Sequence, residues 1–329
     1  MPIVASAPGK VMVAGEYAVL SGASALVLAV DARARATLVV SSGHSSADGT
    51  DRPPGPVVGS PAGRLLPPEV LLTKAEAERV LGIPPMDLTI DTSALREGDR
   101  KLGLGSSAAG AVAAAAAVFA SAGVDPAGAR DRVFRAALAG HHAVAPHGSG
   151  ADVAASAHGG LLKYRREGDV VEITPRTMPS ALRTLLVWTG TPVRTSDLVD
   201  RVRALRESDA RAHAAAIGAI REAAIALDRA IEADDASAIL DATRAHHDAM
   251  RVLGEKADAP IVTSALGKLA DIARARGGAS KPSGAGGGDV AIVFVPKSND
   301  DASFAGELEV QGLRLLSIAL GAEGARAEK

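Results

Sequence analysis

Cysteine is absent from this chain of 329 residues, and aromatic residues are scarce, with one Trp, two Tyr and four Phe. The lack of cysteine excludes disulfides, thiolate metal ligands and a cysteine nucleophile, and it is consistent with a reducing compartment. The few aromatic rings argue against a surface that stacks nucleic-acid bases and against the aromatic belts of membrane proteins. Hydrophobic residues make up 47% of the chain and are mainly Ala, Val and Leu, so we expect a core of small side chains.

An excess of charge of either sign is also absent, because 36 Lys and Arg residues stand against 38 Asp and Glu residues. The formal charge of −2 provides no general attraction to nucleic acids or anionic membranes. Lys10 and Glu16 interrupt the N-terminal apolar stretches, and the most apolar segment, 108–122, is too short for a bilayer of about 30 Å. We therefore expect a cytoplasmic protein without membrane or nucleic-acid partners, and composition leaves its oligomeric state open.

The length of the chain is typical of about two domains. Turn residues at Pro8-Gly9, Gly15 and Ser21-Gly22 predict several short strands, followed by one long strand over 26–40. Residues 42–68 are rich in Gly, Ser, Pro and Asp and predict a surface loop. Up to residue 188, the remaining pattern predicts helices over 69–81, 108–122 and 127–145, and strands over 87–91, 160–164, 170–174 and 182–188.

The rest of the chain is predicted to be mostly helical. The simplest partition is a mixed α/β N-terminal domain, residues 1–175, followed by a helix-rich α+β C-terminal domain, residues 176–329. The pattern predicts helices over 196–208, 211–233, 236–252, 260–276 and 301–320, a glycine loop over 284–288 and a strand over 290–295.

The segment Gly103-Leu104-Gly105-Ser106-Ser107 precedes the alanine-rich helix. Its glycines allow a ligand to approach the backbone closely. Because the first amides of a helix have no partner within the helix, this terminus suits a polyphosphate. The serine hydroxyls could also ligate Mg²⁺. Taken alone, the segment favours a serine that only caps the helix.

Two other nucleotide-binding patterns do not fit this chain. Gly103, Gly105 and Ala108 satisfy the dinucleotide pattern G-x-G-x-x-A, with Asp125 at a plausible distance for a ribose contact. The preceding residues, 96–101, are nearly all charged, whereas that pattern must follow a buried parallel strand. The Walker sequence G-x-x-x-x-G-K-[ST] does not occur in the chain.

Two further segments carry candidate site residues. Ser6-Ala7-Pro8-Gly9-Lys10 is followed by Gly15-Glu16-Tyr17, so a lysine, an acid and a phenol lie close in sequence. Residues 282–289 read Pro-Ser-Gly-Ala-Gly-Gly-Gly-Asp. Four glycines in five positions cost conformational entropy, and a simple turn needs only one or two of them. We expect a ligand that lies against this backbone.

Together, segments 8–17, 101–109 and 283–289 resemble the three motifs of the GHMP kinase superfamily, in the same order along the whole chain. Within the superfamily the resemblance is strongest to the phosphomevalonate kinases, through residues 148–154 and 188–190. It implies a two-domain α+β GHMP kinase fold with a cleft between the domains. Mevalonate kinases, other small-molecule GHMP kinases and a non-catalytic nucleotide-binding protein of the same fold are the alternatives.

The resemblance also implies an activity, namely transfer of the γ-phosphate of ATP to the small molecule 5-phosphomevalonate, with Mg²⁺ as the second cofactor. Mevalonate kinases of the superfamily carry a glutamate as a second Mg²⁺ ligand where this chain has His141, so the full set of metal ligands stays open. By position, the resemblance assigns catalytic roles to Lys10 and Asp152, ATP binding to Gly103, Leu104, Gly105, Ser106, Ser107 and Ala108, metal binding to Ser107, and substrate binding to Glu16, Tyr17, Lys101, Ser149, Gly150, Ser283, Gly284, Ala285 and Gly286.

The histidines do not predict a metal site. His141 and His142 are adjacent and cannot share one face of a helix, and His147 adds no standard metal spacing. His246 and His247 have no sequence context that assigns them a role.

The implied acceptor determines which residues should matter most for the rate. A phosphate monoester has a second pKa of about 6, so it is largely a dianion at neutral pH and hardly needs a base. Two phosphates brought into line need positive charge instead. We therefore expect Lys10→Met to lower kcat more than Asp152→Asn in steady-state kinetics, with Lys101 also contributing and Asp152 mainly positioning Lys10. A far larger loss in the aspartate variant would contradict this ranking.

Overall fold

The computed structural model describes residues 2–39, 66–190 and 195–328. Two long antiparallel strands, β1 (Ile3–Ala14) and β2 (Ala25–Val39), form the centre of the first sheet. The prediction that Pro8-Gly9 ends a strand is wrong, because β1 continues through it with a shift of register between Pro8 and Gly9. A Cβ on Gly9 would lie 2.6 Å from the carbonyl oxygen of Leu104. The glycine therefore serves a close approach of another segment rather than a turn.

The first sheet is antiparallel and has the strand order β12-β1-β2-β6-β7, with β3 also paired to β2. The long strand predicted over 26–40 is confirmed as β2. The shorter strands predicted over 87–91, 160–164 and 170–174 are confirmed as β3, β6 and β7 of this sheet. A 3-10 turn, η1 (Ala18–Ser21), connects β1 to β2. Besides β1 and β2, the sheet contains β3 (Asp87–Asp91), β6 (Leu161–Glu167), β7 (Val170–Arg176) and β12 (Arg326–Ala327).

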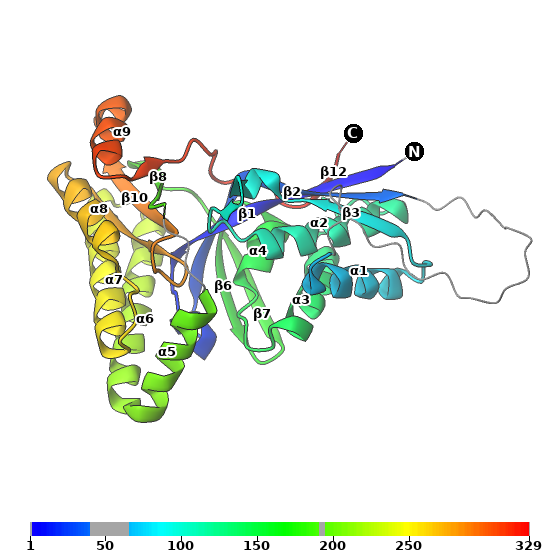
Figure 1. The fold of residues 1–329 in the computed structure, drawn as a ribbon, viewed down its shortest axis with the longest axis horizontal. Helices are drawn as coiled ribbons and strands as arrows, with labels where there is room; N and C mark the ends of the chain where they lie inside the picture. The colour runs from blue at the N-terminus through cyan, green and yellow to red at the C-terminus, as the bar shows by residue number, and fades with distance from the viewer. Residues whose placement is uncertain (1, 40–65, 191–194, 329) are drawn as a thin grey trace, which may run out of the picture.

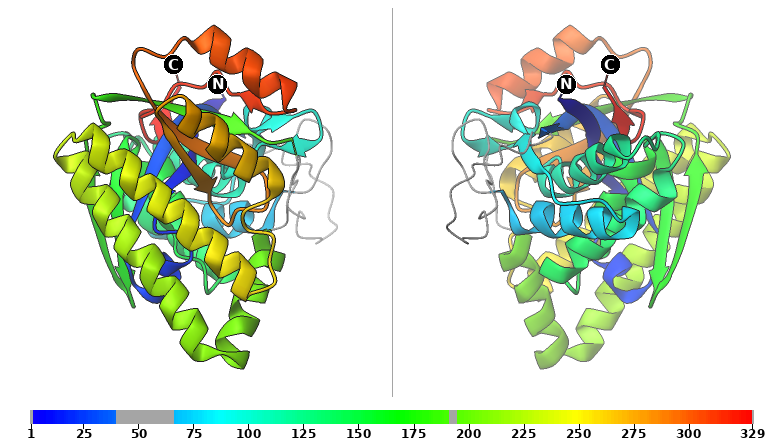
Figure 2. Two further views of the ribbon diagram at one scale, coloured as in Figure 1. Left: turned by 90° about the vertical axis from the view of Figure 1, so that its left-hand side faces the viewer. Right: turned by 90° about the vertical axis from the view of Figure 1, so that its right-hand side faces the viewer.

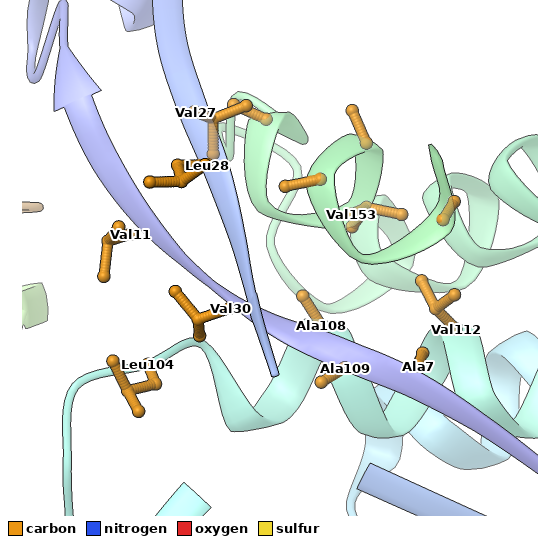
Figure 3. Close-up of a cluster of buried hydrophobic side chains, with 14 of the residues drawn as sticks. Ala7, Val11, Val27, Leu28, Val30, Leu104, Ala108, Ala109, Val112 and Val153 are labelled. Carbon is orange, nitrogen blue, oxygen red and sulfur yellow. The ribbon is translucent and has the colours of Figure 1, made fainter. Parts of the chain in front are cut away.

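Four helices cover one side of this sheet: α1 (Pro68–Leu81), α2 (Ser106–Ser121), α3 (Arg130–Val144) and α4 (Ala151–His158) (Figure 1). Every side chain of α2 from Ala108 to Phe119 is buried. Figure 3 shows the alanines of α2 and Val153 of α4 beside valines and leucines of β1 and β2. Small side chains let α2 lie close to the strands, as the composition predicted.

Among the N-terminal helices, the predictions for α1 and α2 are confirmed, whereas α3 begins at Arg130, three residues later than predicted. Helix α4 was not predicted, since Gly148 to Asp152 interrupts the helical pattern of the sequence. In the structure Gly150 has φ +80° and is the N-cap of α4, which begins at Ala151. A short hairpin follows η2 (Ser93–Leu95) and consists of β4 (Arg96–Glu97) and β5 (Arg100–Lys101).

The second sheet is antiparallel with the order β11-β8-β10-β9. Helices α6 and α7 lie side by side in the left view of Figure 2, and α7 and α8 contact β9. The strands are β8 (Leu182–Trp188), β9 (Ala279–Ser283), β10 (Val290–Pro296) and β11 (Arg314–Leu315), and the helices are α5 (Thr195–Ser208), α6 (Ala210–Glu232), α7 (Ala236–Lys256), α8 (Ser264–Ala275) and α9 (Asp301–Val310).

The predicted helix over 301–320 is wrong beyond Val310. Gly312 has φ +71°, and the chain then forms β11 and returns to the first sheet, where β12 pairs with β1. The buried side chain of Arg33 holds this return by donating to the carbonyl oxygens of Glu323 and Gly324, each at 2.8 Å. Both ends of the chain therefore lie at the same sheet (Figure 1). The domain boundary at residue 175 falls within β7 and stays a prediction.

Two further outcomes concern the absence of membrane features and the surface loop. Within residues 2–39, 66–190 and 195–328, no helix has the length and hydrophobicity needed to cross a membrane. The loop predicted over 42–68 lies almost entirely outside the described residues.

The packing of α1 on α3 depends on a glycine. A Cβ on Gly140 would lie 2.4 Å from the backbone nitrogen of Thr73, so Gly140→Ala should lower the free energy of unfolding by about 2 kcal/mol or more. Gly218, within α6, has nothing within 4 Å of that position, so Gly218→Ala is the control and should stabilise by about 0.5–1 kcal/mol. Urea unfolding measures both changes. Equal stability of Gly140→Ala and the wild type would contradict the packing.

Candidate active site

The glycine loop before α2 lies directly on Lys10. The backbone N–H of Lys10 donates to the carbonyl oxygen of Leu104 at 2.8 Å. A Cβ on Gly105 would lie 3.0 Å from both Cγ and Cε of Lys10. The absence of side chains at Gly105 and Gly9 thus lets the first and second sequence motifs touch. Lys10, which is half-buried, extends along the loop.

The N-terminus of α2 is open to a ligand. Its N-cap is Gly105, with φ +75°, and no side chain caps it. Ser106 and Ser107 therefore do not act as the capping residues that the local sequence also allowed. Because the first helical amides lack partners and carry the positive end of the helix dipole, they suit phosphate oxygens. Ser107 Oγ instead donates to Glu69 Oε1 of α1 at 2.5 Å.

The third glycine segment contacts both others. Met12 N–H donates to Ser283 Oγ at 2.8 Å, and Tyr17 Oη donates to the carbonyl oxygen of Ala285 at 2.6 Å. A Cβ on Gly103 would lie 2.7 Å from Cβ of Asp289. The three motifs, far apart in sequence, thus lie together in the structure.

Asp152 lies at the start of α4, in its first turn. Asp152 is half-buried, and its Oδ1 accepts the N–H of Val153 at 3.0 Å. Just before it, the carbonyl oxygen of Ser149 accepts a hydrogen bond from Tyr164 Oη at 2.6 Å. Burial raises the pKa of Tyr164 to about 12, so its hydroxyl stays protonated and donates. Within the described part of the chain, no hydrogen bond or ion pair joins Asp152 to Lys10.

A cavity of about 1160 Å³ opens beside Tyr17 and Ser149 and extends to α5 and α6. Its lining holds two carboxylates, Glu167 and Glu207, and more cationic groups. This local excess of positive charge, in a chain with a formal charge of −2, suits an anionic ligand. The arginines that line the cavity are Arg165, Arg166, Arg203, Arg206 and Arg221.

These arginines differ in the hydrogen bonds and ion pairs that they form with other protein groups. Arg165 donates to the carbonyl oxygen of Gly22 and to Glu167, whereas Arg206 and Arg221 form no hydrogen bond or ion pair with other described residues. Those two guanidinium groups are exposed and available to a ligand.

Glu16 is buried among protein groups rather than open to a ligand, with 2% of its surface exposed. Its Oε1 pairs with Lys281 Nζ at 2.5 Å, and its Oε2 lies 3.2 Å from His246 Nε2. Burial by itself would raise the pKa of Glu16, but the charge of Lys281 outweighs burial and holds that pKa below its ordinary value. Burial lowers the pKa of His246 to about 4, so the ring is neutral at pH 7.

Sequence reasoning missed Lys281, His246 and Glu69. A pattern for His246 was present, since α7 buries Ile239, Thr243 and Met250, and spacings of three and four residues place His246 on the same face. Nothing local distinguishes Lys281 or Glu69 from surface charges. Of the other predicted residues, Lys101 is exposed on the β4–β5 hairpin, and Gly284 and Gly286 have φ near +80°.

His142 lies against Arg166, and burial followed by the charge of Arg166 lowers the pKa of His142. His147 is exposed in the cavity wall. In the part of the chain that the structure describes, no group of three or more His, Asp or Glu side chains is placed to hold a metal ion.

Comparison with known proteins identifies the family. The model of the GHMP kinases N terminal domain matches residues 70–160, and the GHMP kinases C terminal model matches residues 227–309. A phosphomevalonate kinase from Streptomyces sp. (strain CL190) is 30% identical, and the match covers 98% of each chain. This chain belongs to the GHMP kinase family.

Other proteins are similar over smaller parts of the chain or at lower identity. A mevalonate kinase from Aeropyrum pernix is 34% identical over 62% of each chain. Among solved structures, the Lin0012 protein from Listeria innocua has a TM-score of 0.83 at 24% identity and full coverage of both chains. Streptococcus pneumoniae phosphomevalonate kinase in complex with phosphomevalonate and AMPPNP has a TM-score of 0.78 at 21% identity, over 96% of this chain and 99% of that one. These structures confirm the predicted GHMP kinase fold.

Proposed function

We propose that this GHMP kinase is a phosphomevalonate kinase, which transfers the γ-phosphate of ATP to 5-phosphomevalonate to give 5-diphosphomevalonate and ADP. The observation that carries the proposal is the arginine-rich cavity beside Ser149 and Tyr17, because an acceptor that already bears a phosphate needs such a surface. The curated phosphomevalonate kinase that matches 98% of the chain supports the same acceptor. The proposed reaction belongs to the mevalonate route to isoprenoids and needs only small-molecule partners in the cytoplasm.

The nucleotide would bind at the N-terminus of α2. Gly103 and Gly105 allow the phosphates to approach the backbone, and the amides of Ser106, Ser107 and Ala108 would face them. Leu104 and Ala108 have buried side chains, so their contribution would come from the backbone alone. The side chain of Lys10, against Gly105, would add a fixed positive charge on the same side.

Magnesium would fit between α1 and α2. Ser107 Oγ and Glu69 Oε1, 2.5 Å apart, are oxygen donors of the kind that Mg²⁺ prefers, and Ser107 is exposed beside the free amides of α2. Bound there, Mg²⁺ would neutralise charge on the nucleotide phosphates. Glu69 would thereby provide the carboxylate ligand for Mg²⁺. The sequence did not identify it, because the position of the glutamate in mevalonate kinases is His141 in this chain.

The acceptor would lie between the start of α4, the third motif and the β4–β5 hairpin. Asp152, Ser149 and Gly150 would approach it from α4, residues 283–286 from the third motif, and Lys101 from the β4–β5 hairpin. Because the acceptor phosphate is mainly a dianion at neutral pH, the site must above all offset the repulsion between two phosphates. Lys10 and Lys101 would supply that charge, and Asp152 would orient the acceptor end of the site.

A second candidate acceptor is mevalonate, which the Aeropyrum relative favours. Mevalonate is an alcohol, so its phosphorylation would use Asp152 as a base for the hydroxyl proton. The two candidates thus differ in the role of Asp152 and in the need for the arginine surface.

A panel of acceptors with coupled detection of ADP tests the proposed function. With 5-phosphomevalonate, kcat/KM should exceed that with mevalonate by about 100-fold or more, because the cationic site loses its partner when the phosphate is missing. Faster turnover of mevalonate would assign the chain to the second candidate. Nucleotide binding without release of ADP for any acceptor would instead indicate a non-catalytic binding protein.

The metal site has its own test. Glu69→Gln should weaken the binding of ADP in the presence of Mg²⁺ by about tenfold and leave metal-free binding unchanged, as measured by titration calorimetry. Glu76→Gln, on the same helix, removes only a contact with Arg79 and is the matched control. An unchanged Mg²⁺ dependence in Glu69→Gln would exclude this carboxylate as a ligand.

A further inference from the structure

A fully buried cluster of ionisable side chains lies behind the first and third motifs. Glu16, from the turn after β1, pairs with Lys281 of β9, and His246 of α7 lies beside them. Lys281 and His246 have no exposed surface, and Glu16 is 2% exposed. None of the three can therefore reach a substrate directly, although the sequence motif assigns Glu16 to the substrate.

We propose that Lys281 and His246 are positioning residues for the acceptor, acting through Glu16 and the two turns that the cluster joins. The inference rests on the proposed function only in that the cavity beside Tyr17 holds the acceptor. The cluster would set the shape of the acceptor side of the site and would leave the nucleotide side unaffected.

The hydrogen bonds of the cluster fix two separate stretches of backbone. Glu16 Oε1 accepts from Lys281 Nζ at 2.5 Å and from the N–H of Gly284 at 3.3 Å. Lys281 Nζ also donates to the carbonyl oxygen of Pro282 at 2.6 Å, and His246 Nε2 accepts the N–H of Gly15 at 3.0 Å. The turn that begins at Gly15 and the loop that begins at Pro282 are thus held by one set of side chains.

These two stretches meet the cavity at Tyr17. Tyr17 lines the cavity with Ser149, and its hydroxyl donates to the carbonyl oxygen of Ala285 at 2.6 Å. Its backbone has φ +60° and ψ −47°, and the N–H of Ala18 donates to the carbonyl oxygen of Glu16 across it, as in a γ-turn. This conformation is costly for a bulky residue and persists only when its surroundings impose it. Glu16 directly precedes Tyr17, so the buried cluster imposes this conformation from behind.

The nucleotide loop meets the third segment at its last residue, Asp289, and not at the turn that the cluster holds. Residues 103–105 contact Lys10 and Asp289, and among the described residues no hydrogen bond or ion pair joins that loop to Glu16, Lys281 or His246. Loosening the cluster should therefore affect the acceptor and spare ATP. A buried ion pair is also a weak source of net stability, since well-packed apolar groups often do as well, which is consistent with a role in geometry.

Kinetic analysis of variants separates positioning from stability. In Lys281→Met and Glu16→Gln, the KM for the acceptor should rise by about tenfold or more, whereas the KM for ATP changes by less than about twofold. Each single variant should also have a lower Tm, because it leaves one buried group unpaired. In the Glu16→Gln/Lys281→Met double variant, Tm should recover towards that of the wild type while the acceptor KM stays high.

His246 has a conservative replacement that makes the test sharper. His246→Gln can still accept the N–H of Gly15 through its amide oxygen, so the acceptor KM should stay close to that of the wild type. His246→Leu fills similar space but cannot accept a hydrogen bond, so the acceptor KM should rise.

Asp228→Asn is the matched control for a destabilised protein. Asp228 is 7% exposed and accepts from Lys163 Nζ and Arg176 Nε, each at 2.7 Å, far in sequence from both motifs. This variant should lower Tm without changing the acceptor KM. The inference is overturned if Asp228→Asn raises the acceptor KM as much as Lys281→Met, if ATP and acceptor KM rise together, or if the double variant recovers both Tm and acceptor KM.

Hydrogen exchange provides a readout that does not need turnover. In Lys281→Met, amides of residues 15–17 and 283–286 should exchange faster, whereas amides of 103–108 should not. If the wild type phosphorylates no acceptor of the panel, the proposed function fails, while this exchange pattern still tests the positioning role. Unchanged exchange at both turns would overturn the inference.

Discussion

The close approach of the glycine loop to β1 is the constraint on which the rest of the site depends. Gly9 and Gly105 lack the Cβ atoms that would collide with Leu104 and Lys10. The hydrogen bond from Lys10 N–H to the carbonyl oxygen of Leu104 then fixes the loop on the strand. Because α2 begins immediately after this loop, the contact determines where its free amides point. The lysine, the amides and the loop thereby form one surface.

Buried polar clusters connect parts of the chain that are remote in sequence. Asp228 joins β6 and β7 to α6, Arg33 holds the C-terminal segment on the first sheet, and Glu16 joins the first and third motifs. A buried charge without a partner is costly, so each cluster tolerates only a narrow set of arrangements. The packing of small apolar side chains in Figure 3 stabilises the fold without a preferred direction. The buried polar clusters determine which segments of the chain lie against each other.

The candidate site combines groups with different exposure. Ser107, Arg206 and Arg221 are exposed and offer charge or oxygen donors to a ligand, whereas Glu16 is buried and paired with protein groups. A residue can therefore belong to a family motif without contacting substrate. In this chain the burial of Glu16 is what separates a binding role from a positioning role.

The sequence alone determined most of the local structure, namely the alternation in β2, the helical periodicity from α5 to α8, and the three glycine motifs that predicted the family. Those patterns depend on residues two to four positions apart. Only the tertiary structure decided that β1 continues through Pro8-Gly9, that α4 begins directly after Gly150, that the chain beyond Val310 returns to the first sheet, and that Lys281 and His246 surround Glu16. These outcomes depend on partners far away in sequence, whose contacts can override local turn and helix preferences.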